Sequence, residues 1–308
     1  EDVSERLDIV PAQFRVIVTR RPKYACRACE EVVVQAPVPA RLVEGGIPTE
    51  ATVAHVLVSK YADHLPLYRQ AQIYGRQGVN LDRSTLADWV GKAAFLLRPV
   101  HERLFERLKA STKLFADETT APVLDPGRGR TKTGQFFAYA RDERPWGGAD
   151  PPGVAYLYAP DRKAEQPIRH LQGFAGVLQV DGYAGYNTLA GKNAVSLAFC
   201  WSHVRRKFYD LAQGGPAPIA SEALLRIAEL YRIEGDIRGC PAEERRNVRQ
   251  TRSRPLVAAL EPWLQGKLGL VSQKSKLAEA IRYALSRWAG LSRFLDDGRI
   301  EIDSNVVE

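Results

Sequence analysis

Two aspartates that each follow a short apolar run constrain the fold of this chain more than any other feature. Asp117 follows Leu-Phe-Ala, and Asp181 follows Val-Leu-Gln-Val. Short apolar runs of this kind are typical of buried strands. Carboxylates at the ends of neighbouring strands can share a hard divalent cation. The sequence therefore predicts a sheet with an acidic, metal-binding edge.

A third acidic residue, Glu308, ends the stretch Asp-Ser-Asn-Val-Val-Glu, which has the signal of a helix start. Two aspartates on strands and a glutamate on a helix can converge on two Mg²⁺ or Mn²⁺ ions. A pair of such ions is the chemistry of phosphodiester cleavage and strand transfer. Glu118 and Glu301 are the alternative ligands.

The order of the expected elements predicts an α/β fold. The strand candidates cover residues 114–117, 135–140, 154–158, 177–180 and 194–199. Gly- and Pro-rich turns separate the first three, which suggests an antiparallel meander. A helix is expected from Asp161 through Leu171, and a basic helix is expected after Cys200. This order matches a ribonuclease-H-like mixed sheet, and we assign that core to residues 111–215.

The region after this core has an almost entirely helical pattern. We expect a helical insertion over residues 216–300, and residues 301–308 begin the helix that carries the third acidic residue. Such an insertion would separate Glu308 from Asp181 in the sequence while leaving it free to return to the sheet in space.

The first forty residues contain a Cys-x-x-Cys pair, Cys26 and Cys29. One such pair supplies two of the four ligands of a structural zinc, so residues 1–40 are expected to form a partial zinc-binding segment, a zinc knuckle. The other two ligands would have to lie upstream. A redox-active pair is less well supported because no βαβ pattern surrounds it, and two incidental cysteines are the remaining alternative.

Residues 41–110 are expected to form a helical DNA-binding module. Thr49 can cap a first helix, Pro66 opens a second, and Asp82 or Ser84 caps a third. Two helices joined by a short Gly-containing turn are compatible with a helix-turn-helix. A plain helical bundle is the alternative.

The charge of the chain favours a polyanionic partner. Its 308 residues include 44 Lys and Arg against 36 Asp and Glu, a formal net charge of +8. The predicted DNA contacts are Arg128, Arg130, Lys132, His203, Arg205, Arg206, Lys207, Arg245, Arg246 and Arg249. The alternative for each basic run is an ordinary solvated helix face or hairpin tip.

No apolar run approaches the roughly 20 residues that a bilayer-spanning helix needs, and the chain opens on no secretory signal. A cytoplasmic, nucleoid-associated location in a bacterium is therefore expected, with no membrane partner. The chain contains no Met and begins Glu-Asp-Val. We expect a fragment of a longer protein.

Several stretches together resemble the transposases of the insertion sequence 66 family, which are Asp-Asp-Glu enzymes. The matching stretches are Arg-Pro-Lys-Tyr-Ala-Cys-Arg-Ala-Cys at 21–29, Leu-Pro-Leu-Tyr-Arg-Gln at 65–70, Arg-Ser-Thr-Leu-Ala-Asp-Trp-Val at 83–90, Ala-Asp-Glu-Thr at 116–119, Gln-Val-Asp-Gly-Tyr-Ala-Gly-Tyr-Asn at 179–187 and Cys-Trp-Ser-His-Val-Arg-Arg-Lys-Phe at 200–208. They cover nearly the whole chain.

The resemblance implies a function and a set of partners. It implies that Asp117, Asp181 and Glu308 are the catalytic triad, and that an upstream Cys-x-x-Cys completes the zinc site. The expected partners are the double-stranded DNA of the element ends and the target, a second copy of the chain in a homodimer, and accessory proteins of the same element.

The chain departs from the family pattern at its last motif. Ser304 stands where the family has Asn, and no residue follows Glu308. Because terminal helix turns fray, we expect this chain to hold metal weakly. An inactive DNA-binding regulator or remnant and a structure-selective nuclease are the alternative functions.

Overall fold

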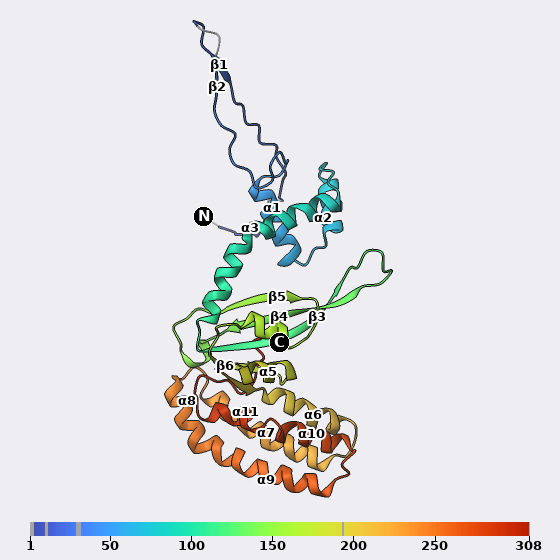
Figure 1. Cartoon of the computed structure of the whole chain (residues 1–308), viewed down its shortest axis with the longest axis vertical. Coiled ribbons are helices and arrows are strands. Elements are labelled where there is room, and N and C mark those ends of the chain that lie inside the picture. Colours follow the sequence, from blue (N-terminus) through green and yellow to red (C-terminus); the bar gives the residue numbers. More distant parts are fainter. Residues whose placement is uncertain (1–2, 10–11, 29–31, 193, 308) are drawn as a thin grey trace. The chain divides into compact units, whose positions relative to one another are not determined.

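The computed structural model describes residues 3–9, 12–28, 32–192 and 194–307. Two residues with predicted roles, Cys29 and Glu308, lie outside the described residues. The chain divides into two compact units, Glu1–Val100 and His101–Glu308, and each is described by itself (Figure 1).

The first unit begins with a two-stranded antiparallel hairpin and continues with helices. Its strands are β1, Lys23–Ala25, and β2, Val33–Gln35. Its helices are α1, Glu50–Tyr61, α2, Leu67–Arg76, and α3, Arg83–Lys109, of which the last extends into the second unit. The three helices expected for this region are therefore present.

Local chemistry explains where the helices begin. The Thr49 hydroxyl accepts a hydrogen bond from the Thr52 backbone N–H at 3.3 Å, which satisfies one of the free donors of α1. Leu86, Trp89 and Ala93 of α3 are buried against α1 and α2. Leu97 continues the same helical stripe but is 53% exposed, because the core of this unit ends near Ala93.

The second unit is built on a five-stranded mixed sheet. Its strands are β3, Lys113–Val123, β4, Lys132–Arg141, β5, Gly153–Ala159, β6, Gly176–Val180, and β7, Val195–Phe199. The spatial order is β5-β4-β3-β6-β7. The first three strands are antiparallel, whereas β6 is parallel to β3 and β7 is parallel to β6. The predicted α/β class is confirmed.

One face of the sheet carries its own hydrophobic core. Leu108 of α3, Phe137 of β4 and Tyr186 are among the buried residues that pack there. The covering helices are α4, Glu165–His170, and α5, Ala184–Lys192. The prediction of a helix from Asp161 was wrong at its start. The Asp161 carboxylate instead accepts hydrogen bonds from the Lys163 backbone and the Gln166 side chain, which form a turn.

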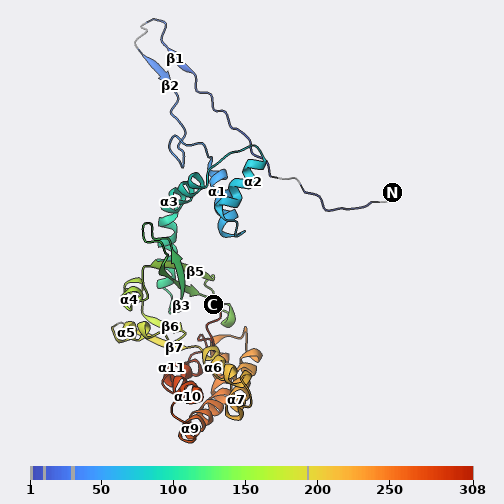
Figure 2. The ribbon, with the colours of Figure 1, turned by 90° about the vertical axis from the view of Figure 1, so that its right-hand side faces the viewer.

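A helical bundle lies beyond β7 in both views (Figures 1 and 2). Its core includes Trp201, Phe208 and Leu260, and Ala198 of β7 joins the same cluster. The elements of the bundle are α6, Trp201–Gln213, α7, Pro218–Asp236, α8, Ala242–Val248, the π-helix Arg249–Ser253, α9, Arg254–Leu270, α10, Lys276–Leu285, α11, Trp288–Ser292, and the 3-10 turn Arg293–Leu295. Another 3-10 turn, Arg144–Trp146, lies between β4 and β5. The helical character expected for this region is confirmed.

Within the described part of the chain, no helix combines the length and apolar surface that a bilayer crossing requires.

A buried ion network joins the bundle to the segment that returns toward the sheet. Arg249 donates to both carboxylate oxygens of Glu234, at 2.8 and 2.6 Å. Arg245 donates to Glu234 at 3.3 Å and to Glu301 at 2.6 Å. Arg249 also donates to the backbone oxygens of Phe294 and Asp297. Both guanidiniums are almost fully buried, so each depends on these carboxylates for charge compensation.

Removing the shared carboxylate by Glu234→Ala is expected to reduce the free energy of unfolding by about 3–5 kcal/mol, because the buried Arg249 loses its carboxylate partner and the buried Arg245 keeps only Glu301. Urea denaturation measures the change. Glu229→Ala is the matched control on the same helix, since Glu229 is half exposed and pairs with the exposed Arg232. Its expected effect is below about 1 kcal/mol. Equal effects of the two substitutions would contradict the role given to the network.

Candidate active site

The pairing of β3 with β6 brings the two predicted aspartates together. The parallel register joins Lys113 to Val177 and Phe115 to Gln179. Asp117 and Asp181 each lie two residues further along, so they stand at corresponding positions on adjacent strands. Neighbouring strands are about 4.8 Å apart. The prediction that the two aspartates lie side by side is confirmed, whereas the prediction that the first strand ends at Asp117 was wrong, because pairing with β4 continues β3 to Val123.

Three carboxylates gather at this position. Oxygens of Asp117, Glu118 and Asp181 all lie within 4.8 Å of one another, and all three residues are half-buried. An Asp181 carboxylate oxygen accepts a hydrogen bond from the Tyr183 backbone N–H at 2.9 Å. The Asp181 backbone oxygen accepts from the Tyr283 hydroxyl of α10 at 2.7 Å. The loop that carries Asp181 is thus fixed from both sides.

Glu118 is held by the protein itself. Its side chain is only 1% exposed, and it accepts a hydrogen bond from Arg162 Nε at 2.9 Å and one from the Tyr186 hydroxyl at 3.0 Å. Burial raises the pKa of Glu118, the hydrogen bond from Arg162 opposes that rise, and the charge of Asp181 adds to it. Two oxygens of Glu118 are therefore already bound by side chains of the protein.

The donor set fits a hard divalent cation. Carboxylate oxygens are the ligands that Mg²⁺ and Mn²⁺ prefer, and they need no proton to be removed near neutral pH. Two oxygens that bind one ion at about 2.1 Å are at most about 4.2 Å apart, so oxygens within 4.8 Å of one another are close to the spacing that a shared ion requires. Asp117 and Asp181 are the residues here that could hold it.

The segment that leads to Glu308 is anchored at the same end of the sheet. The Gln179 side chain donates to the backbone oxygens of Glu301 and Asp303, at 2.7 and 2.9 Å, and accepts from the Glu301 N–H at 3.2 Å. The Ser304 N–H donates to Cys200 Sγ at 3.3 Å. These bonds fix the chain as far as residue 304. The position of Glu308 lies outside the described residues, so its role stays a prediction.

Gln179 was missed in the sequence analysis. It is fully buried, and it bonds a segment more than 120 residues away. The available signal was one polar residue within the apolar run Val-Leu-Gln-Val. The carboxylate of Glu301, the other alternative ligand, accepts a hydrogen bond from Arg245 at 2.6 Å.

Three of the predicted DNA contacts lie together on α6. His203, Arg205 and Arg206 line one shallow pocket with Ser202 and Asn305. The Lys207 ammonium lies 4.5 Å from the ring centre of Tyr283, the residue that bonds the Asp181 backbone. The basic start of α6 and the end of the chain therefore share one surface.

A second predicted group occupies the hairpin between β3 and β4, which projects beyond the sheet (Figure 1). Arg128, Arg130 and Lys132 are all exposed there. Arg128 pairs with Asp125 at 3.3 Å. An exposed pair of this kind contributes little to stability, so Arg128 can exchange that partner for a phosphate at little cost.

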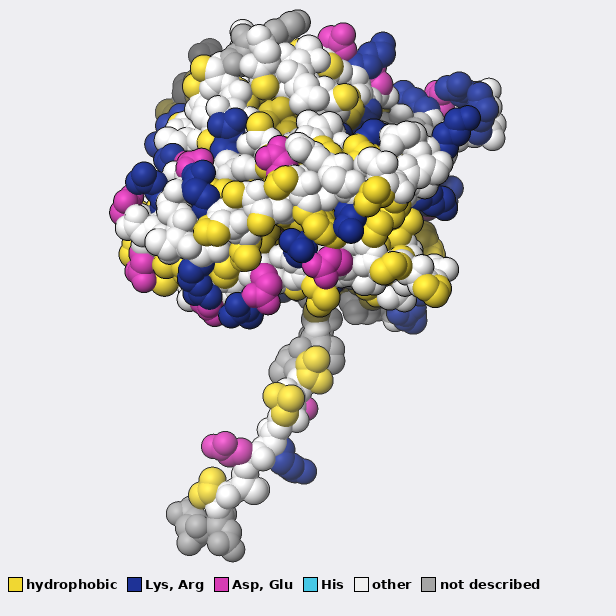
Figure 3. Space-filling view, turned by 90° about the horizontal axis from the view of Figure 1, so that it is seen from below, with side chains coloured by type: hydrophobic (Ala, Val, Ile, Leu, Met, Phe, Trp, Pro, Cys, Tyr) yellow, Lys and Arg dark blue, Asp and Glu magenta, His cyan; other side chains and the backbone are white. Residues whose placement is uncertain are grey.

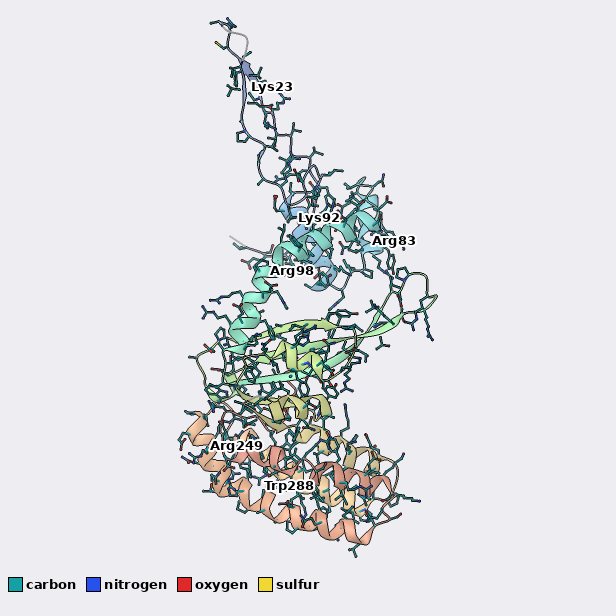
Figure 4. The ribbon with its side chains drawn as sticks, in the orientation of Figure 1. Lys23, Arg83, Lys92, Arg98, Arg249 and Trp288 are labelled. Atoms are coloured by element: carbon teal, nitrogen blue, oxygen red, sulfur yellow. The ribbon has the colours of Figure 1, made fainter. Side chains whose placement is uncertain are left out.

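The prediction that Arg245 and Arg249 contact DNA is wrong in this structure. Their guanidiniums are 1% and 0% exposed and are bound by Glu234 and Glu301. Arg249 lies within the helical bundle in Figure 4. Arg246, the residue after Arg245 on α8, is exposed and pairs with Glu243.

Acidic side chains also lie among the basic ones on the face of the molecule that Figure 3 shows.

Comparison with known proteins identifies the family. A family model described as "Transposase IS66 family" matches residues 45–308. This match spans the sheet, the acidic cluster and the helical bundle. The chain belongs to the IS66 transposase family. A second model, described as the zinc-finger binding domain of transposase IS66, matches residues 1–30.

The IS66 relatives are longer proteins. Uncharacterized protein y4qI of Sinorhizobium fredii (strain NBRC 101917 / NGR234) is 52% identical over 315 residues, which cover all of this chain and 58% of that protein. Uncharacterized protein y4jD of the same strain is 51% identical, with 61% of its length covered. The chain thus spans about three fifths of the length of these relatives.

The IS66 zinc-finger match includes the cysteine pair. Cys26 follows β1 directly and is exposed, whereas Cys29 lies outside the described residues. A Cys-x-x-Cys sequence at the end of a short strand is typical of a zinc knuckle. Zinc binding by this pair stays a prediction.

The acidic site makes a prediction for metal binding. Asp117→Asn and Asp181→Asn are each expected to weaken Mn²⁺ binding by more than about tenfold in calorimetric titration, because each removes a charged ligand. Glu118→Gln is expected to change it less, because Arg162 and Tyr186 already occupy that carboxylate. Asp210→Asn, on the exposed surface of α6, is the matched control. Unchanged binding in both aspartate variants would contradict the site.

Proposed function

We propose that the chain contains the catalytic part of a metal-dependent DNA transposase, which cuts DNA strands at the ends of an insertion sequence and joins them to target DNA. The observation that carries the proposal is the pair Asp117 and Asp181 on adjacent parallel strands of a chain that belongs to the IS66 family. Carboxylates gathered on two adjacent strands at the centre of a sheet suit metal-dependent chemistry on phosphodiesters.

The topology supports a ribonuclease-H-like assignment. Three antiparallel strands followed by two parallel strands give the order β5-β4-β3-β6-β7. In this arrangement the first strand of the sheet lies at its centre, next to the fourth. The two acidic residues come from these two strands, as the proposal requires.

In the proposed site, Asp117, Asp181 and Glu308 hold two Mg²⁺ or Mn²⁺ ions. Such ions would supply activation of the attacking water or 3′-hydroxyl and charge compensation for the leaving 3′-oxygen. Tyr183 and Tyr283 keep the Asp181 loop in place through their bonds to its side chain and backbone. Gln179 holds the segment that leads to Glu308.

Basic side chains around the acids bind the DNA backbone in this proposal. His203, Arg205 and Arg206 would contact phosphates at the pocket beside Asn305. Lys207, Arg246 and the hairpin residues Arg128, Arg130 and Lys132 would contact DNA further away. Each phosphate contact contributes to affinity in a salt-dependent way and carries no sequence information.

The first unit binds DNA in the same proposal. Cys26 and Cys29 hold a structural Zn²⁺ together with two ligands of the longer protein, and α1 to α3 act as the helical DNA-binding module. The partners are double-stranded DNA, a second copy of the chain and accessory proteins of the same element.

A cleavage assay on DNA that carries the ends of the insertion sequence encoding this chain tests the proposal. Asp117→Asn is expected to reduce Mg²⁺-dependent cleavage by more than about a hundredfold. Removing a residue that only orients a metal ligand typically reduces activity by about 10–100-fold, and removing the ligand itself is expected to reduce it further. DNA binding, measured by gel shift, is expected to stay within about twofold because the basic residues remain.

Two outcomes of this assay contradict the proposal. A parent chain that binds the element ends without cleaving them indicates a regulator that needs no catalysis. Cut DNA without 3′ ends joined to a target indicates a nuclease on the same sheet.

A further inference from the structure

Three aromatic side chains on the sheet are unusually exposed. Phe136 of β4 is 44% exposed, and Tyr156 and Tyr158 of β5 are 59% and 45% exposed. We call these three residues the aromatic patch. Val154 of β5 and Thr119 of β3 are exposed as well, so this face of the sheet is open to solvent around the patch. Large exposed aromatic groups on a rigid strand are available to a planar ligand.

The patch lies on the same face of the sheet as Asp117. Asp117 pairs with Ala138, and Ala138 pairs with Tyr156. In the next row, Thr119 pairs with Phe136, and Phe136 pairs with Tyr158. Directly paired residues share a face. Tyr156 is thus two strands from Asp117, a distance of about 10 Å, which equals about three stacked nucleotides at ~3.4 Å each.

The position of Tyr158 is built into the sheet. A Cβ atom at Gly134 would lie 2.5 Å from a ring carbon of Tyr158, so only glycine leaves room for the ring there. The edge of Phe136 meets Tyr158 with ring centres 5.9 Å apart at 67°. Because the ring is confined by its neighbours, little conformational entropy is lost when a ligand stacks on it.

The same two strands lead from the patch to positive charge. Lys132 begins β4, two residues before Gly134, and Arg128 and Arg130 follow in the projecting hairpin. The β3–β4 hairpin therefore carries Asp117, Phe136 and the basic residues, and the neighbouring strand β5 adds Tyr156 and Tyr158 to the same face of the sheet. A ligand that complements the carboxylates, the aromatic rings and the cations has a phosphate, a π-face and further negative charge.

We propose that the aromatic patch stacks unpaired bases of the DNA strand that enters the acidic site. The inference deepens the proposed function and depends on it for the source of the DNA. Bases stack on aromatic side chains without sequence preference, because every base has a π-face. The patch thereby holds the strand next to the scissile phosphate in an unpaired form.

Binding of single-stranded DNA by the full chain in the absence of divalent metal tests this inference. The probes are fluorescent oligo(dT) and an abasic oligonucleotide of the same length, which keeps the phosphates and lacks the bases. The double variant Tyr156→Ala/Tyr158→Ala is expected to bind oligo(dT) about tenfold or more weakly, and the abasic probe within about twofold of the parent chain. Tyr156→Phe/Tyr158→Phe keeps both rings and is expected to bind like the parent. Leu225→Ala, an exposed apolar residue of α7, is the surface control.

Three results overturn the inference. Unchanged binding of oligo(dT) by the double alanine variant excludes stacking, and equal losses for both probes assign the effect to the backbone. A double variant that changes only the oligomeric state, measured by light scattering, assigns the patch to a protein interface. A parent chain that never cleaves DNA but shows the ring-dependent difference contradicts the proposed catalysis and leaves the stacking site intact.

Discussion

The parallel hydrogen bonding between β3 and β6 is the constraint on which the rest of the structure depends. It aligns Lys113 with Val177, and so places Asp117 beside Asp181 although 63 residues separate them in sequence. A shift of register by one residue would move one carboxylate to the other face of the sheet. Because Leu114 and Ala116 of β3 and Leu178 and Val180 of β6 are buried in one core, such a shift would also expose apolar side chains. The packing that stabilises the fold therefore also fixes the candidate site.

A second layer of interactions connects the helical bundle to that site. The shared carboxylate of Glu234 compensates the buried Arg245 and Arg249, and Arg245 in turn holds Glu301. Lys113 at the start of β3 donates to the Arg299 backbone at 2.7 Å, and burial lowers its pKa to about 7 despite the opposing charge of Glu301. These contacts guide the chain from the bundle back to the strand ends, where Gln179 binds it. The helical bundle thus supports the last described segment of the chain.

The sequence predicted the strands and both aspartates because local signals determine them. Apolar runs followed by an acidic residue identify a buried strand without knowledge of distant partners, but they gave the strand end only for β6, since β3 continues beyond Asp117 to Val123. The helix α5 escaped prediction because its nine residues include two glycines, Gly185 and Gly191, which weaken helical patterns. The burial of Arg249 also could not be predicted, since its partner Glu234 comes from a different helix 15 residues away. Charge runs alone do not separate a solvated helix face from a compensated buried cluster.

The central claim is that Asp117 and Asp181 share one divalent ion. The most direct measurement is the anomalous difference density of a crystal of this chain soaked in Mn²⁺. We predict a peak in contact with one carboxylate oxygen from each aspartate at about 2.1–2.2 Å. A crystal that keeps β3 and β6 in this register, but shows Mn²⁺ only at other residues, would contradict the account.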